Sequence, residues 1–113
     1  MGNNPNLSET VRELMADSGL DRTTCEELVY GFVAQAQRLI IDIKDSIIKN
    51  DFKRTDLFLH QLKGSAGNIR ARGISRLALE AEGAMKSIDV NKVGGLLREI
   101  EEILGSFIGY REG

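Results

Sequence analysis

His60, the single histidine of the 113-residue chain, is the side chain best suited to chemistry. Around it, apolar residues recur every three or four positions between residues 51 and 73, which is typical of an amphipathic helix. When this helix is wound at about 100° per residue, His60 falls opposite the apolar stripe and is predicted to point into solvent. Four further residues lie within about 60° of it on the same face, namely Asp56, Lys63, Gly64 and Gly67.

An exposed imidazole in this setting can act as a nucleophile, because it is partly neutral near neutral pH and needs no separate base. Lys63, one turn away, can offset the charge of about −1.5 to −2 that a phosphoryl group carries. A glycine inside a helix costs about 1 kcal/mol relative to alanine, and Gly64 and Gly67 would leave room for a partner protein to approach. A lone surface histidine is usually only solvated, but these neighbours favour a reactive one.

Residues 60–65 read His-Gln-Leu-Lys-Gly-Ser and are followed by Ala-Gly-Asn-Ile. This run resembles the His-x-Leu-Lys-Gly-Ser motif of histidine phosphotransfer (HPt) domains. The resemblance extends over nearly the whole chain, since that family folds as a four-helix bundle with the phosphorylated histidine in mid-helix, and residues 77–81 look like its following helix. It implies that His60 is the phosphoacceptor, that Lys63 stabilises the phosphoryl group and that Gly64 provides steric clearance.

The same resemblance makes Gln61 and Ser65 polar helpers of the site. The chain departs from the family pattern at two positions, because Arg70 stands where the family usually has glycine and Leu59 where it usually has a small residue. Leu59 falls on the apolar stripe and is predicted to be a core residue. Arg70 lies about 80° round the helix from His60 and is predicted to be solvated or at the rim of a partner contact.

Leu57 projects about 60° from His60 and away from the apolar stripe. A single exposed leucine is common on protein surfaces. Beside a phosphoacceptor, however, Leu57 could contact a docked partner, because the cores of protein interfaces favour apolar side chains. The predicted partner-docking residues are Asp56, Leu57, Gln61 and Gly67.

The resemblance implies that a phosphoaspartate on a response-regulator receiver domain donates its phosphoryl group to Nε2 of His60, which passes it to another receiver. A hybrid sensor kinase is a further candidate partner. The sequence shows no glycine-rich nucleotide loop and no evident acidic pocket for Mg²⁺. We therefore expect a phosphocarrier that is not an enzyme, has no autokinase activity and has no cofactor of its own, with Mg²⁺ held by the partner receiver domain.

Two alternatives belong to other functional classes. The first is an adaptor that binds receivers without transferring phosphate, although the presence of both His60 and Lys63 favours transfer. The second is a small hydrolase with His60 as general base. That reaction requires a positioned nucleophile or a metal, and a concave pocket, and the sequence indicates neither.

The composition describes one folded domain over residues 1–113, with 42% apolar and 28% charged residues. Lys and Arg number 15 and Asp and Glu 17, so no basic excess attracts nucleic acid or an anionic membrane. One cysteine cannot form an intrachain disulfide, and no apolar run is long enough to span a bilayer, so we expect a cytoplasmic protein. A carrier that exchanges partners is expected to be a monomer, with flexible ends at residues 1–7 and 110–113.

The apolar periodicity predicts helices over approximately residues 8–19, 23–50, 51–73, 74–88 and 92–109. The predicted N-caps are Ser8, Thr23 in a capping box with Glu26, Asp51, and Asp89 or Asn91 for the last helix. Each of the last four helices has one apolar face, and short connections join them. We therefore predict an all-α fold, an antiparallel up-and-down four-helix bundle with a short N-terminal capping helix.

Overall fold

The computed structural model describes residues 5–112, with side chains described for residues 7–108. The helices in that part are α1 (Pro5–Ser18), α2 (Arg22–Ile48), α3 (Phe52–Asn68), α4 (Arg72–Met85) and α5 (Val90–Glu112). No strand occurs among the described residues, so the prediction of an all-α fold is confirmed. Of the two ends that we expected to be flexible, residues 1–4 and 113 lie outside the described part, whereas residues 5–7 and 110–112 are helical.

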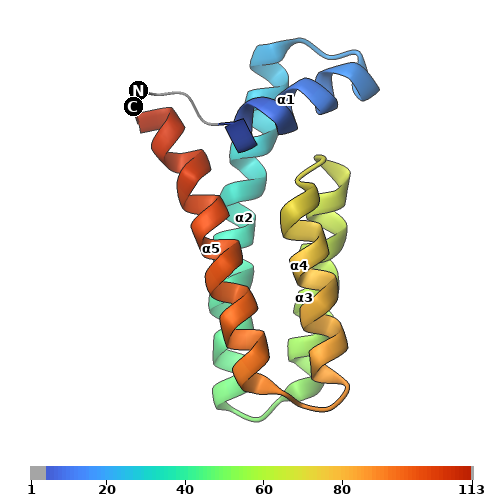
Figure 1. The fold of residues 1–113 in the computed structure, drawn as a ribbon, viewed down its shortest axis with the longest axis vertical. Helices are drawn as coiled ribbons and strands as arrows, with labels where there is room; N and C mark the ends of the chain where they lie inside the picture. Colours follow the sequence, from blue (N-terminus) through green and yellow to red (C-terminus); the bar gives the residue numbers. More distant parts are fainter. Residues whose placement is uncertain (1–4, 113) are drawn as a thin grey trace.

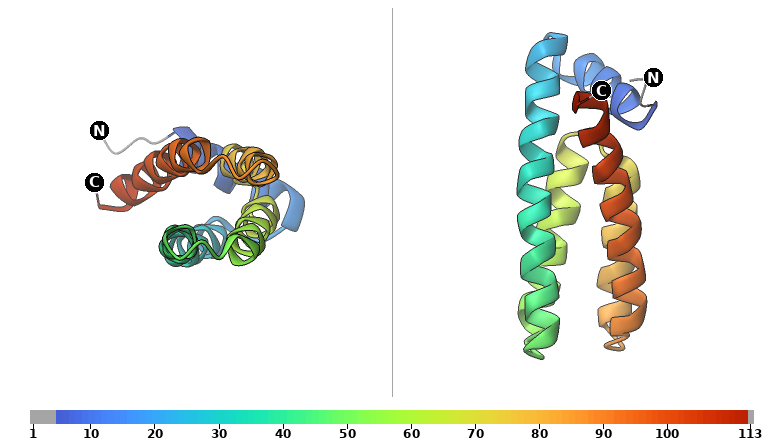
Figure 2. Two further views of the ribbon diagram at one scale, coloured as in Figure 1. Left: turned by 90° about the horizontal axis from the view of Figure 1, so that it is seen from below. Right: turned by 90° about the vertical axis from the view of Figure 1, so that its left-hand side faces the viewer.

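Figure 1 shows α2, α3, α4 and α5 side by side along the long axis of the molecule, with α1 crossing one end of them. Contacts link α2 with α3, α3 with α4, α4 with α5, and α5 with α2, so these four helices surround one core. The view from below in Figure 2 shows them in the same order around that core. None of the described helices is both long enough and apolar enough to cross a membrane.

The first two helices do not begin at the predicted residues. Helix α1 begins at Pro5 instead of after Ser8, because the fixed φ and the missing N–H of proline suit the first turn of a helix. Helix α2 is capped by Asp21, whose carboxylate accepts a hydrogen bond from the backbone N–H of Thr24 at 2.9 Å. Hydrogen bonding from the Thr24 side chain, and then from its backbone N–H, lowers the pKa of Asp21. The predicted capping box at Thr23 is therefore wrong.

Aspartates cap two of the later helices. Asp51 caps α3, as predicted, and its carboxylate accepts a hydrogen bond from the backbone N–H of Arg54 at 3.4 Å. Before α5, the carboxylate of Asp89 accepts from the backbone N–H of Lys92 at 3.1 Å. A carboxylate at a helix N-terminus also interacts favourably with the helix dipole, so both residues stabilise the helices that they precede.

Three non-glycine residues that follow helix ends have a left-handed backbone, namely Asn50 with φ 56°, Arg70 with φ 68° and Ile88 with φ 52°. At the end of α3, the N–H of Arg70 donates to the carbonyl of Gly67 at 3.1 Å, and the N–H of Ala71 donates to that of Ala66 at 2.8 Å. These two bonds form a Schellman motif, in which glycine is the usual left-handed residue because it has no Cβ. The motif turns the chain sharply from α3 into α4.

Arg70 corrects two of the predictions. We expected the third helix to continue to Gly73, but α3 ends at Asn68, and Gly73 lies in the first turn of α4. The Arg70 side chain is also bound and not simply solvated, since its Nε donates to Asp17 of α1 at 2.6 Å and its Nη1 to the Gly67 carbonyl at 3.0 Å. The left-handed φ explains why the resembled family usually has glycine here, and the bonds to Asp17 and Gly67 explain how an arginine is accommodated.

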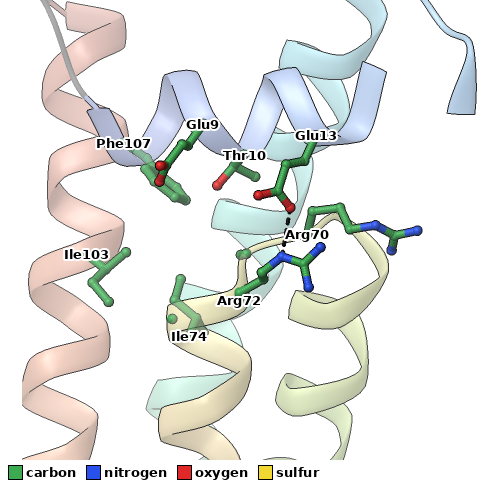
Figure 3. Close-up of a pocket in the computed structure, with 10 residues that line it drawn as sticks. Glu9, Thr10, Glu13, Arg70, Arg72, Ile74, Ile103 and Phe107 are labelled. Carbon is green, nitrogen blue, oxygen red and sulfur yellow. Dashed lines mark hydrogen bonds and ion pairs between the residues drawn. The ribbon is translucent and has the colours of Figure 1, made fainter. Parts of the chain in front are cut away.

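Helix α1 packs against the end of the bundle through apolar and charged contacts. Leu7, Val11 and Leu14 are buried against the other helices. At the surface, Nε of Arg72 donates to Glu13 at 2.7 Å, and this hydrogen bond raises the pKa of Arg72. Figure 3 shows the contact at the rim of a small pocket between α1, α4 and α5.

Candidate functional site

Helix α3 holds His60 on the outside of the bundle. The opposite side of this helix is buried, with Leu59 and Leu62 fully inaccessible, which confirms that Leu59 is a core residue. Thr55 is buried on the same side, and its hydroxyl is hydrogen-bonded to that of Ser46 on α2 at 2.6 Å. Because these contacts fix the rotation of α3, the His60 side chain is 66% exposed, and its predicted exposure is confirmed.

Glu82 of α4 joins His60 to Lys63. Its Oε2 lies 3.1 Å from Nδ1 of His60, and its Oε1 lies 2.8 Å from Nζ of Lys63. The Glu82 side chain is only 16% exposed, whereas that of His60 is largely in solvent. One carboxylate therefore spans the interface between α3 and α4 and binds two groups on α3.

The surroundings of Glu82 keep it ionised. Burial by itself raises the pKa of this carboxyl, but the hydrogen bonds from Lys63 and His60 outweigh it, and the pKa lies below its ordinary value. An ionised carboxylate can only accept hydrogen bonds. Nδ1 of His60 must therefore carry the proton in the bond to Glu82, and in the neutral imidazole the lone pair is on Nε2.

The two glycines predicted to clear the approach to His60 differ in the structure. A Cβ added to Gly64 would meet nothing within 4 Å, so this side of α3 is open. A Cβ added to Gly67 would lie 3.7 Å from the hydroxyl oxygen of Ser75 on α4, and Gly67 is half-buried. Gly67 therefore lies against α4, and its contact with a docking partner stays a prediction.

The other residues predicted for the site are Asp56, Leu57, Gln61 and Ser65. Asp56, Leu57 and Gln61 are exposed, and Leu57 is 56% accessible although it is apolar. Ser65 is half-buried. A shallow surface groove beside the histidine is lined by Asp51, Lys53, Arg54, Asp56, Leu57, His60 and Glu82. The structure thus brings Asp56 and Leu57 to the same groove as His60, and Gln61 lies outside it.

Sequence reasoning missed Glu82, which lies 22 residues beyond His60. The winding of a single helix shows which residues share a face of that helix, but it does not show which residues of another helix lie opposite. The one available signal was the position of Glu82 beside the buried Ala81, at the edge of the apolar face of α4. A charged residue at such an edge is often only solvated.

The chemistry of this arrangement is that of a surface acceptor. The exposed imidazole of His60 can act as a nucleophile through Nε2, Lys63 supplies a positive charge, and Glu82 binds both groups from α4. Comparison with known proteins gives one match, in which the model of the Hpt domain family matches residues 27–107 and includes every residue of the site. No curated protein and no solved structure matches the chain. Because the matched region covers most of the sequence, the chain belongs to the Hpt domain family.

Proposed function

We propose that this chain is a phosphocarrier in which His60 accepts a phosphoryl group from the phosphoaspartate of one receiver domain and passes it to another. Domains of the Hpt family take part in phosphotransfer within phosphorelays and interact with receiver domains. The observation that carries the proposal is the state of the imidazole, with Nδ1 bound to Glu82 and the side chain otherwise exposed. Its other nitrogen is thus free to meet a partner.

The proposed transfer needs no reactant other than His60 and the phosphorylated receiver. The Nε2 lone pair attacks the phosphorus of the acyl phosphate, the bond from phosphorus to the aspartate oxygen breaks, and the aspartate leaves as a carboxylate with that electron pair. The ring, which keeps its proton on Nδ1, gains positive charge as the N–P bond forms. Glu82 lies 3.1 Å from Nδ1 and stabilises that charge. The second transfer reverses these steps towards another aspartate.

Lys63 has a different partner before and after transfer in this mechanism. In the unphosphorylated protein its ammonium lies 2.8 Å from Glu82. A phosphoryl group on Nε2 carries about −1.5 to −2 charges near neutral pH and competes for the same ammonium. We propose that Lys63 turns from Glu82 to the phosphoryl oxygens, which its flexible side chain permits.

Several features of the relay would come from the partners or the setting. The receiver would supply Mg²⁺ and the acidic residues around its aspartate, and the carrier would have no autokinase activity. We place the carrier in the cytoplasm as a monomer, because it must exchange one receiver for another. Contacts around the ring of α2, α3, α4 and α5 support an antiparallel up-and-down bundle as the rigid mount of His60.

The test is incubation of the protein with a receiver domain carrying a labelled phosphoryl group. We expect label on this chain that is lost in acid and retained in alkali, as for phosphohistidine, and no label on His60→Gln. Because His60 is the only histidine, phosphohistidine on the wild-type chain identifies the site without mapping. Binding of receivers without transfer of label would contradict the proposal and indicate a non-transferring adaptor.

A further inference from the structure

Helix α4 runs beside the part of α3 that carries the site. The hydroxyl of Ser75 donates to the Lys63 carbonyl at 3.2 Å, and Glu82 binds both His60 and Lys63. The α4 segment from Ser75 to Glu82 therefore passes His60 and Lys63 in the direction opposite to α3. Residues of α4 that project outwards from this segment lie within one or two turns of the imidazole.

Leu79 is one of these outward residues. It lies three positions before Glu82, on the adjoining turn of α4, and its side chain is 56% exposed. Leu57, on α3, is equally exposed and lies three positions before His60. Large apolar side chains thus flank the charged site on both helices, and water covers them in the free protein.

Two glycines have matching positions on the two helices. Gly64 follows Lys63 on α3, and Gly83 follows Glu82 on α4, so each comes directly after a residue that holds the site. A Cβ at either position would meet nothing within 4 Å. Other helical glycines such as Gly105 are equally open, so open space alone does not distinguish Gly64 and Gly83. What distinguishes these two is that each directly follows a residue of the site.

We propose that the receiver docks across both helices, with Leu79 and Gly83 of α4 forming one half of its contact surface and Leu57 and Gly64 of α3 the other. This proposal rests on the proposed function and adds the position of the partner. A stable protein contact covers about 800 Å² on each partner, so a receiver centred on His60 is expected to contact side chains of both helices. Leu79 is an apolar anchor, and Gly83 lets the partner approach α4 closely.

The first test replaces the anchor. Leu79→Asp is expected to raise the KM for a phosphorylated receiver about tenfold, because an exposed apolar anchor is lost from a contact centre. The matched control is Ile41→Asp, which changes an apolar side chain of α2 that is 66% exposed and lies in a groove with α5. It should transfer like the wild type. Equal KM values for the wild type and Leu79→Asp would overturn the proposal.

A small phosphoryl donor separates docking from chemistry. Phosphoramidate needs no docking surface, so it should label His60 at the same rate in the wild type and in Leu79→Asp. A wild-type protein that is labelled by phosphoramidate but by no receiver would contradict the proposed function itself. Transfer from the receiver that is normal in both proteins would contradict only the docking surface.

The second test uses glycine. Gly83→Gln is expected to raise Tm by about 4 °C, because glutamine favours a helix more than glycine does and space is open, yet to slow transfer from the receiver about tenfold. Gly105→Gln on α5 is the control, with a similar rise in Tm and unchanged transfer. A purely structural role for Gly83 predicts no loss of transfer in the more stable variant, and that result would overturn the proposal.

Discussion

Two of the places where ion pairs join the described helices differ in how the charges are shared. Beside His60, the single carboxylate of Glu82 binds two groups of α3 and is largely buried. At the end of the bundle, Arg72 pairs with Glu13 of α1 (Figure 3), and the Arg72 side chain is largely exposed. The first group contains an imidazole with a second ring nitrogen, whereas the guanidinium of the second group has no lone pair to offer as a nucleophile.

On the proposed function, this difference separates a reactive site from a contact that only holds two helices together. Arg72 has a carboxylate partner of its own in Glu13. At Glu82, movement of Lys63 towards a phosphoryl group would leave the carboxylate to His60 alone. Exposed ion pairs contribute about 0–1 kcal/mol to stability, so the contact of Arg72 with Glu13 is only a minor part of what holds α1. The buried Leu7, Val11 and Leu14 do more.

Removing Glu82 should have the largest effect. Glu82→Ala deletes a charge-assisted hydrogen bond to Nδ1, worth about 1.5–3 kcal/mol, and transfer from a receiver should slow by about 10–100-fold. Glu82→Gln keeps an acceptor for Nδ1 and should recover part of the rate. The matched control is Glu13→Ala, which removes the carboxylate at the other end of the bundle. Equal slowing of transfer in Glu82→Ala and Glu13→Ala would contradict a special role of Glu82 in the transfer.

Removing the cation at each place should give the next largest difference. Lys63→Gln is expected to slow transfer about tenfold, since the phosphoryl group loses one charge-assisted contact. Arg72→Gln should leave transfer unchanged and lower the free energy of unfolding only slightly, because the ion pair is exposed. Single-turnover transfer and urea unfolding of both variants measure these effects. A slow Arg72→Gln protein with normal stability would show that the end of the bundle takes part in transfer.

Substitutions of Arg70, in the turn between α3 and α4, should have a smaller effect, and on stability alone. Arg70→Ala keeps a Cβ in the left-handed region and loses the bonds to Asp17 and Gly67, so it should destabilise the protein. Arg70→Gly loses the same bonds but relieves about 1–2 kcal/mol of backbone strain, so its free energy of unfolding should stay within about 1 kcal/mol of the wild type. Transfer should be normal in both. Urea unfolding in which the glycine variant is no more stable than the alanine variant would argue against strain at Arg70.

The pH dependence should show the smallest effect. The folded pKa of Glu82 is lowered, so its contribution to stability is fully present above its unfolded pKa and is lost as the pH falls through the folded value. Glu82→Gln should therefore lose less stability than the wild type between neutral pH and a pH below the folded pKa of Glu82. Urea unfolding at the two pH values measures the difference. Equal losses of stability in the wild type and in Glu82→Gln would contradict a lowered pKa of Glu82 in the folded protein.

The periodicity of the sequence was sufficient for the helical fold and for the face on which His60 lies. Leu59 and Leu62 recur on one side of α3 and are buried, so the exposure of His60 followed from winding alone. The helix boundaries were less well predicted. Asp21 and Thr23 are both good caps, and the choice between them depends on backbone geometry that the sequence does not display. The same holds for Arg70, where a left-handed turn replaced the expected continuation to Gly73.

By itself the sequence determined a surface histidine with a lysine and an open glycine beside it on one helix. These residues lie within one turn of His60, and local helix geometry fixes their relation. Only the tertiary structure decided that Glu82 meets His60 and Lys63 and that Gly67 lies against Ser75 of α4. The reason is that the rotation and register of α4 against α3 are set by packing in the core and by the Schellman turn at Arg70, which join residues far apart in the chain.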